Sequence, residues 1–116
     1  MNKVQLIGRI THDVELKKTP AGKSVVSFRI AVPRKKKEEG ADFLNCVAWD
    51  GAAEILAKFV SKGDRLAVAG RIQTRSWERD GKRQFAVEII VDELSLLENK
   101  DPVQQSVDDV LPPFRD

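Results

Sequence analysis

Short stretches in which apolar and polar residues alternate with a period of two constrain this chain more than any other feature. Residues 4–10 place Val4, Leu6 and Ile10 on one parity and mainly polar side chains on the other, and residues 24–33 repeat the pattern. Successive side chains of a β-strand point to opposite faces, so this period is typical of half-buried strands. The chain is therefore predicted to consist mainly of short strands.

Turn-forming residues divide the chain into five such segments. Residues 20–22 (Pro-Ala-Gly) mark one turn, the run 34–40 has no apolar residue and predicts a solvated loop, and Asp80-Gly81 predicts a two-residue hairpin turn. The last two strands should therefore form a hairpin. Strands are expected at residues 3–10, 24–33, 42–50, 65–77 and 83–94.

A single segment, between the third and fourth predicted strands, has the three- and four-residue spacing of an amphipathic helix. Its apolar face comprises Ala52, Ile55, Leu56, Phe59 and Val60. Asp50 is expected to cap its start and Gly63 to stop it. Five short strands with this helix favour an all-β fold, a five-stranded Greek-key barrel of the oligonucleotide-binding kind (OB-fold). A β-sandwich is the alternative, although it normally needs about seven strands.

The predicted hairpin turn also fixes which residues oppose one another in the last two strands. If Arg79 and Lys82 flank the turn, one face of the hairpin is mostly apolar and the other is polar, and Trp77 lies on the polar side. Trp77 is therefore expected to face away from the core. The pairs on the apolar face are Ile72 with Ile89, Thr74 with Val87 and Ser76 with Phe85, and those on the polar face are Gln73 with Glu88, Arg75 with Ala86 and Trp77 with Gln84.

The third predicted strand separates two aromatic rings from its small apolar side chains. Leu44, Cys46 and Ala48 share one face, which we assign to the narrow barrel interior. Phe43 and Trp49 then lie on the outward face, in the company of Asn45 and Val47. Two large rings on the outward face of one strand need an explanation, because large apolar side chains are usually buried.

A single-stranded nucleic acid offers that explanation, because it needs flat rings for its bases and cations for its phosphates. The outward rings share their strand faces with Arg71, Gln73 and Arg75. Two other interpretations stay open. A ring at a strand end often packs under a loop or at a subunit interface, and the lysines at 35–37 can simply belong to a solvated loop.

Charge is distributed unevenly along the chain. Residues 1–99 hold 18 Lys/Arg and 14 Asp/Glu, a net charge of +4, whereas residues 100–116 hold 2 and 4, a net charge of −2. This division predicts a domain at residues 1–99 that binds an anionic polymer and a short, flexible acidic tail at residues 100–116. Ordinary surface charge would explain the same numbers.

Several motifs in fixed order span nearly all of residues 1–99. They are residues 2–10 (NKVQLIGRI), 13–16, 19–22, 53–54, 59–64, 70–77 (GRIQTRSW) and 85–91. In order and spacing they resemble the bacterial single-stranded DNA-binding protein (SSB) family, which bacteriophages also encode. The resemblance implies an OB-fold barrel, a homotetramer, and a protein that binds single-stranded DNA with little sequence preference and protects it during DNA replication, recombination and repair.

The resemblance also implies roles for individual residues. By position, Phe43, Trp49 and Trp77 would stack on bases, and Lys3, Lys62 and Arg75 would contact phosphates. The loop in which many relatives carry a tryptophan has none here, and its lysines are expected to replace some of that stacking with charge. The full expected DNA-binding set is Lys3, Lys35, Lys36, Lys37, Phe43, Trp49, Lys62, Arg71, Gln73, Arg75 and Trp77.

The end of the chain resembles the acidic, proline-phenylalanine tip with which this family recruits replication, recombination and repair proteins. Phe114 would enter an apolar pocket of the partner while acidic residues meet basic ones around it. Arg115 and Asp116 follow Phe114, whereas the family tip usually ends in phenylalanine. The expected partner-binding residues are Asp108, Asp109, Leu111, Pro112, Pro113 and Phe114.

Other classes of function fit the sequence less well. The main alternative is a primosome-type or phage accessory OB-fold protein that acts chiefly as a bridge between proteins. An enzyme is not expected, since Cys46 and His12, the one nucleophile–base couple, fall on separate strands, and neither a metal site nor a phosphate loop has its spacing here. No cofactor is expected.

The expected location is the cytoplasm. The longest apolar runs are far shorter than a membrane span, and the first residues lack the features of a secretory signal. The single cysteine suits a reducing compartment.

Overall fold

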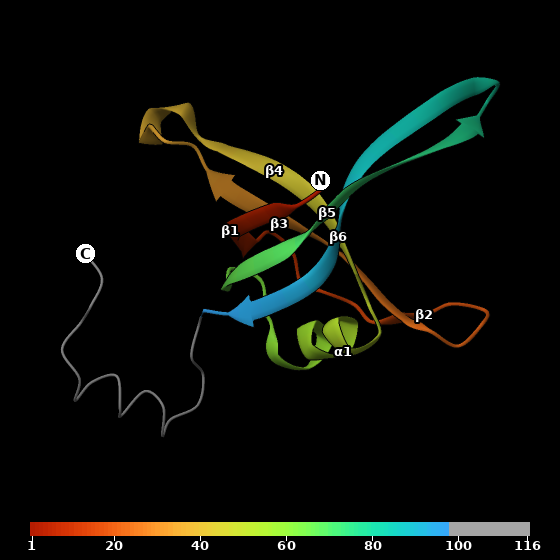
Figure 1. The fold of residues 1–116 in the computed structure, drawn as a ribbon, viewed down its shortest axis with the longest axis horizontal. Helices are drawn as coiled ribbons and strands as arrows, with labels where there is room; N and C mark the ends of the chain where they lie inside the picture. The colour runs from red at the N-terminus through yellow and green to blue at the C-terminus, as the bar shows by residue number, and fades with distance from the viewer. Residues whose placement is uncertain (98–116) are drawn as a thin grey trace.

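The computed structural model describes residues 1–97, so the predicted tail at 100–116 and its partner-binding residues lie outside it (Figure 1). The five predicted strands and the predicted helix are all present. One further strand of two residues, β2, pairs with the start of β3; it is too short to leave an alternating pattern in the sequence. The elements are β1 (Val4–Ile10), β2 (Lys17–Lys18), β3 (Ser24–Pro33), a 3-10 turn η1 (Lys37–Glu39), β4 (Ala41–Trp49), α1 (Asp50–Phe59), β5 (Arg65–Arg79) and β6 (Lys82–Leu96).

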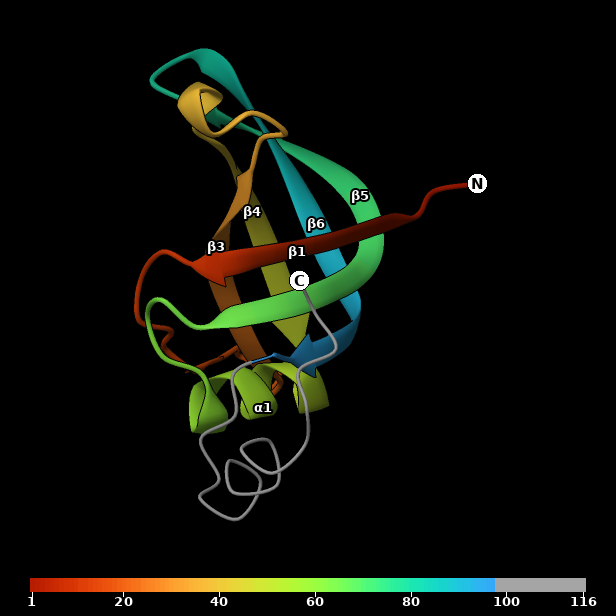
Figure 2. The ribbon, with the colours of Figure 1, turned by 90° about the vertical axis from the view of Figure 1, so that its left-hand side faces the viewer.

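The strands form one sheet that closes on itself. Their order is β1-β5-β6-β4-β3-β2, and β1 also pairs with β3 at Arg9 and Ile10, which completes the ring (Figures 1 and 2). All pairings are antiparallel except that of β4 with β6, which covers only two positions, Cys46 with Ile89 and Val47 with Ile90. Beyond that short contact, β3 and β4 leave the barrel as one arm and the β5–β6 hairpin leaves it as another (Figure 1).

The core fills the ring and is closed at one end by α1. Buried side chains come from each long strand, and the largest fully buried ones on the strands are Val26, Ile30, Leu66 and Val68, while the helix contributes Ala53 and Leu56. Figure 2 shows α1 lying across the lower opening of the barrel. The strands and the helix therefore share a single interior. The predicted apolar face of the helix is only partly correct, because Leu56 and Val60 are buried whereas Ile55 and Phe59 are exposed.

The two predicted helix boundaries are wrong in detail. Asp50 is the first helical residue instead of the cap, with φ of 52°, and the capping position falls on Trp49 without a side-chain hydrogen bond. The helix ends at Phe59 with Val60 as its C-cap, so Gly63 does not stop it. Gly63 serves the following turn instead, where its φ of 91° suits glycine and its N–H donates to the Ile10 carbonyl at 2.8 Å.

Glycine is required where β5 passes from the barrel into the hairpin. The β5–β6 register shifts between Ala69 and Gly70, which marks a bulge. A Cβ at Gly70 would lie 2.0 Å from the carbonyl oxygen of Ile90 on β6. The bend that separates barrel from hairpin therefore depends on the absence of a side chain at this position.

Gly70→Ala is expected to lower the free energy of unfolding by about 3 kcal/mol, because the new methyl group overlaps backbone that cannot move without breaking the ladder. Urea unfolding measures the change. Gly51→Ala is the matched control, since a Cβ there meets nothing within 4 Å and the position is helical. Equal stability of the two variants would contradict the close approach at Gly70.

Candidate nucleic-acid interface

The candidate interface is the outer face of β3, β4, β6 and β5 near the point where the two arms separate. The short β4–β6 contact brings the two arms together at the barrel, and their divergence opens a cleft of about 580 Å³. We refer to it as the inter-arm cleft. Its lining residues are His12, Asp13, Ser27, Phe28, Arg29, Asn45, Cys46, Arg75, Trp77, Ala86 and Glu88.

The three predicted rings are exposed around this face. Phe43 is 56% exposed, Trp49 40% and Trp77 38%. Phe43 and Trp49 lie towards the two ends of β4, and Trp77 lies on the arm formed by β5 and β6. The prediction that these aromatic side chains lie outside the barrel is confirmed. Val47 shares the outward parity of β4 but is buried, at the position where β4 pairs with β6.

Two of the rings have an arginine stacked on them. The Cζ atom of Arg29 lies 5.1 Å from the centroid of the Phe43 ring, and that of Arg75 lies 4.7 Å from the Trp77 ring. Each pair is within the range of a cation–π interaction. An exposed ring and a cation are thus adjacent on both arms.

The predicted arginines of β5 are already paired with carboxylates. Arg75 Nε donates to Glu88 Oε1 at 3.1 Å, and Arg71 Nη1 donates to Asp92 Oδ1. The Arg71 pair is exposed on both sides, whereas Glu88 is largely buried. A phosphate that binds either arginine must therefore compete with an acidic side chain of the protein itself.

The predicted lysines are spread over three places. The backbone N–H of Lys62 donates to Asp13 Oδ1 at 3.0 Å, so Lys62 adjoins the inter-arm cleft through a residue that lines it. Lys3 lies instead beside a different groove, between β1 and β5. Lys35, Lys36 and Lys37 lie exposed in the loop at the end of the β3–β4 arm, where Arg34 and Asp42 form an ion pair with an N–O distance of 2.8 Å. Gln73 is exposed on β5, directly opposite Glu88.

Sequence reasoning missed several cleft residues, chiefly Arg29, Asn45 and Glu88. Arg29 and Asn45 are cross-strand partners in the β3–β4 arm. Both are on the outward parity of their strands, so the alternating pattern contained a signal for them. The pattern did not show that they meet, because the loop between these strands is too long to fix the register.

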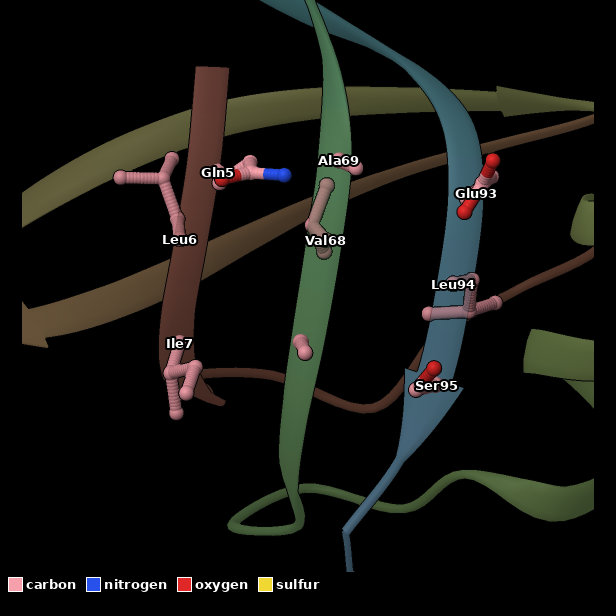
Figure 3. A pocket seen from close by; sticks show the side chains of 9 residues that line it. Gln5, Leu6, Ile7, Val68, Ala69, Glu93, Leu94 and Ser95 are labelled. Carbon is pink, nitrogen blue, oxygen red and sulfur yellow. The ribbon is translucent and has the colours of Figure 1, made fainter.

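A further groove lies over β1, β5 and β6 (Figure 3). Its lining includes Ile7, Ala67 and Ala69, which are apolar, and Gln5, Glu93 and Ser95. Ile7 is exposed to water. The groove has no cation among its lining residues and therefore differs chemically from the inter-arm cleft.

Neither a metal cluster nor a membrane-spanning helix is found in the part of the chain that the structure describes. Within residues 1–97 there is no group of three His, Cys, Asp or Glu side chains placed to hold a metal ion. The helix among these residues is too short and too polar to cross a bilayer.

The profile of the Single-strand binding protein family matches residues 1–97. The chain belongs to this family. Among its relatives, "Single-stranded DNA-binding protein 4" of Streptococcus agalactiae serotype V is 44% identical over 120 residues, which cover 97% of this chain and 87% of that protein. "Single-stranded DNA-binding protein 3" of Clostridium acetobutylicum is 50% identical over 103 residues, covering 84% of this chain and 72% of that protein.

A solved structure has the same fold. The "Plasmodium falciparum SSB complex with ssDNA" superposes with a TM-score of 0.77 at 26% identity and covers 84% of this chain and 96% of that one. The closed sheet and the helix between the third and fourth long strands confirm the predicted OB-fold barrel.

Cys46, at the floor of the inter-arm cleft, should be chemically inert in the folded protein. Burial raises the pKa of its thiol from 9.0 to about 12. At pH 8 the reactive thiolate is therefore roughly a thousandfold scarcer than for an ordinary cysteine. Iodoacetamide at pH 8 should label Cys46 at least about a hundredfold more slowly in native buffer than in guanidinium chloride, as followed by mass spectrometry. Equal labelling rates would show that Cys46 is accessible from the cleft.

Proposed function

We propose that this chain binds single-stranded DNA with little sequence preference, by stacking bases on exposed rings and pairing phosphates with cations. The observation that carries the proposal is the pairing of Arg29 with Phe43 and of Arg75 with Trp77 on opposite arms of one cleft. Membership of the Single-strand binding protein family and the likeness to an SSB solved with ssDNA support it.

The proposed path runs across the outer face from one arm to the other. A strand would pass from Phe43 and Trp49 on β4, over the inter-arm cleft, to Trp77 on β5. Each stacked base contributes about 1 to 3 kcal/mol with little discrimination, because every base has a π-face. Lys62 and the loop lysines at 35–37 would add phosphate contacts whose strength falls as salt rises.

The proposed biological role is to protect single-stranded DNA during replication, recombination and repair. The acidic tail, which lies outside the described residues, would recruit partner proteins through Phe114 and the acidic residues before it. The accessory, protein-bridging function remains the second candidate. It predicts comparable binding to duplex DNA, RNA and single strands, whereas the proposed function requires a clear preference for the single strand.

We also propose that the protein assembles as a homotetramer. Water-exposed apolar side chains on two surfaces away from the cleft support this: Ile7 on the groove of Figure 3, and Ile72, Phe85 and Val87, which are 47%, 72% and 60% exposed on the apolar face of the hairpin. Within the described chain, β1 pairs with β3 only at Arg9 and Ile10, so most of that edge is open to another strand. Patches of this kind typify subunit interfaces.

Trp77→Ala, Trp49→Ala and Phe43→Ala should each weaken binding of a short fluorescein-labelled oligothymidine by about 5- to 150-fold, the equivalent of losing one stacked base. Fluorescence anisotropy at fixed salt measures the affinity. Phe59→Ala is the matched control, since Phe59 is an exposed ring on α1 with Lys58 over it, outside the cleft. Unchanged affinity in all three ring variants would remove the stacking mechanism.

Light scattering should give a mass of about 52 kDa for the free protein, four times the 13.0 kDa of one chain, and this mass plus that of the bound DNA when oligothymidine is added. Ile7→Asp should lower this mass, because it places a charge in an apolar interface. Ile55→Asp, an equally drastic change at an exposed position on α1, should not. A monomeric wild-type protein that still binds DNA would refute the tetramer alone, and a monomer that ignores DNA would refute both proposals.

A further inference from the structure

Arg75 is held between two partners on the wall of the inter-arm cleft. Its Cζ atom lies 4.7 Å from the centroid of the Trp77 ring, so the guanidinium covers the ring face. Its Nε–H donates to Glu88 Oε1, with an N–O distance of 3.1 Å. In the β5–β6 ladder Arg75 directly opposes Ala86, and Glu88 opposes Gln73. Arg75 therefore reaches diagonally across the small Ala86 side chain to meet Glu88, a distance that a long side chain can span.

The two members of this ion pair differ in freedom. The side chain of Glu88 is 17% exposed, whereas that of Arg75 is 59% exposed. Glu88 is therefore the fixed member of the pair, and Arg75 is the one that can turn towards solvent. Glu88 also lines the cleft opposite Arg29 and Asn45 of the other arm, so its negative charge lies on the proposed path of a polyanion.

We propose that Glu88 is a built-in competitor for DNA phosphate. In the free protein Glu88 holds Arg75 over the face of Trp77; when a strand binds, a phosphate replaces Glu88 as the partner of Arg75, and the ring face is released to a base. The inference rests on the proposed function of the cleft. It makes Glu88 a positioning residue that couples the phosphate contact to the stacking contact and limits how tightly the strand is held.

The salt dependence of binding should record this exchange. Each phosphate neutralised by a free cation on single-stranded DNA contributes about −0.7 to the slope of log affinity against log salt. When Arg75 exchanges Glu88 for a DNA phosphate, the freed Glu88 carboxylate attracts a cation from solution. The net number of salt ions released on binding is therefore smaller than for a free arginine. Removal of the Glu88 charge should therefore both strengthen binding and steepen the slope.

The test compares Glu88→Gln with wild type in binding to oligothymidine over a series of salt concentrations. Gln has the shape of Glu and can still accept a hydrogen bond from Arg75, so the fold should persist. We expect roughly fivefold tighter binding at about 0.1 M salt and a slope steeper by about 0.7. Glu54→Gln makes the same charge change on the exposed surface of α1, outside the cleft, and should alter neither value appreciably.

A second readout needs no DNA. Trp49→Phe leaves Trp77 as the only tryptophan, since the chain contains two. In that background, Glu88→Gln should make Trp77 fluorescence more sensitive to acrylamide, because a neutral amide holds Arg75 over the ring less firmly than a carboxylate does. Arg75→Gln should have the same effect. Unchanged quenching in both would overturn the proposed restraint on Arg75, whatever the protein binds.

A third measurement observes Arg75 in the wild-type protein, with Glu88 in place. The NMR signal of the Arg75 Nε–H group, assigned by its loss in Arg75→Lys, should be protected from solvent exchange in the free protein and should shift when oligothymidine is added.

If Glu88→Gln leaves both affinity and slope at wild-type values, or weakens binding, the competitor role is refuted. Failure of wild type to bind oligothymidine would instead refute the proposed function, while the acrylamide result would still stand by itself.

Discussion

The ladder between β5 and β6 is the interaction on which the rest of the structure depends. It begins at the Asp80-Gly81 turn and runs in one register as far as Gly70, then continues after the bulge into the barrel. Because side chains alternate across it, the same register directs Ile89 and Val91 into the core and places Trp77 and Glu88 on the outer face. One pairing pattern thus fixes both the interior of the barrel and one wall of the inter-arm cleft.

Much of this arrangement could be predicted from the sequence because it is local. A two-residue turn leaves a hairpin only one register, and all six pairs expected around Trp77 are present. The strands could be predicted from the two-residue alternation of apolar and polar side chains. The outward position of Phe43 followed from the small side chains that fill the opposite face of β4. These inferences need only neighbours in the chain or across a tight turn.

The remaining features depend on segments that are distant in sequence or joined by long loops. The stacking of Arg29 on Phe43 requires the β3–β4 register, which a long polar loop does not determine. The cleft itself requires β4 to meet β6, a parallel contact between strands separated by a helix and a third strand. The cap assigned to Asp50 was wrong because strand β4 runs directly into the helix, so the position before the helix belongs to Trp49.

The seam between β4 and β6 has a mechanical consequence. Only two residue pairs join the arms there, whereas the ladders within each arm extend over most of their length (Figure 1). The angle between the arms is thus easier to change than the shape of either arm, because opening it breaks few hydrogen bonds, while each arm is held by a long ladder. If DNA follows the proposed path, rigid walls with a compliant spacing would let the cleft accept purines and pyrimidines alike, so the seam would add to the tolerance that the flat rings provide.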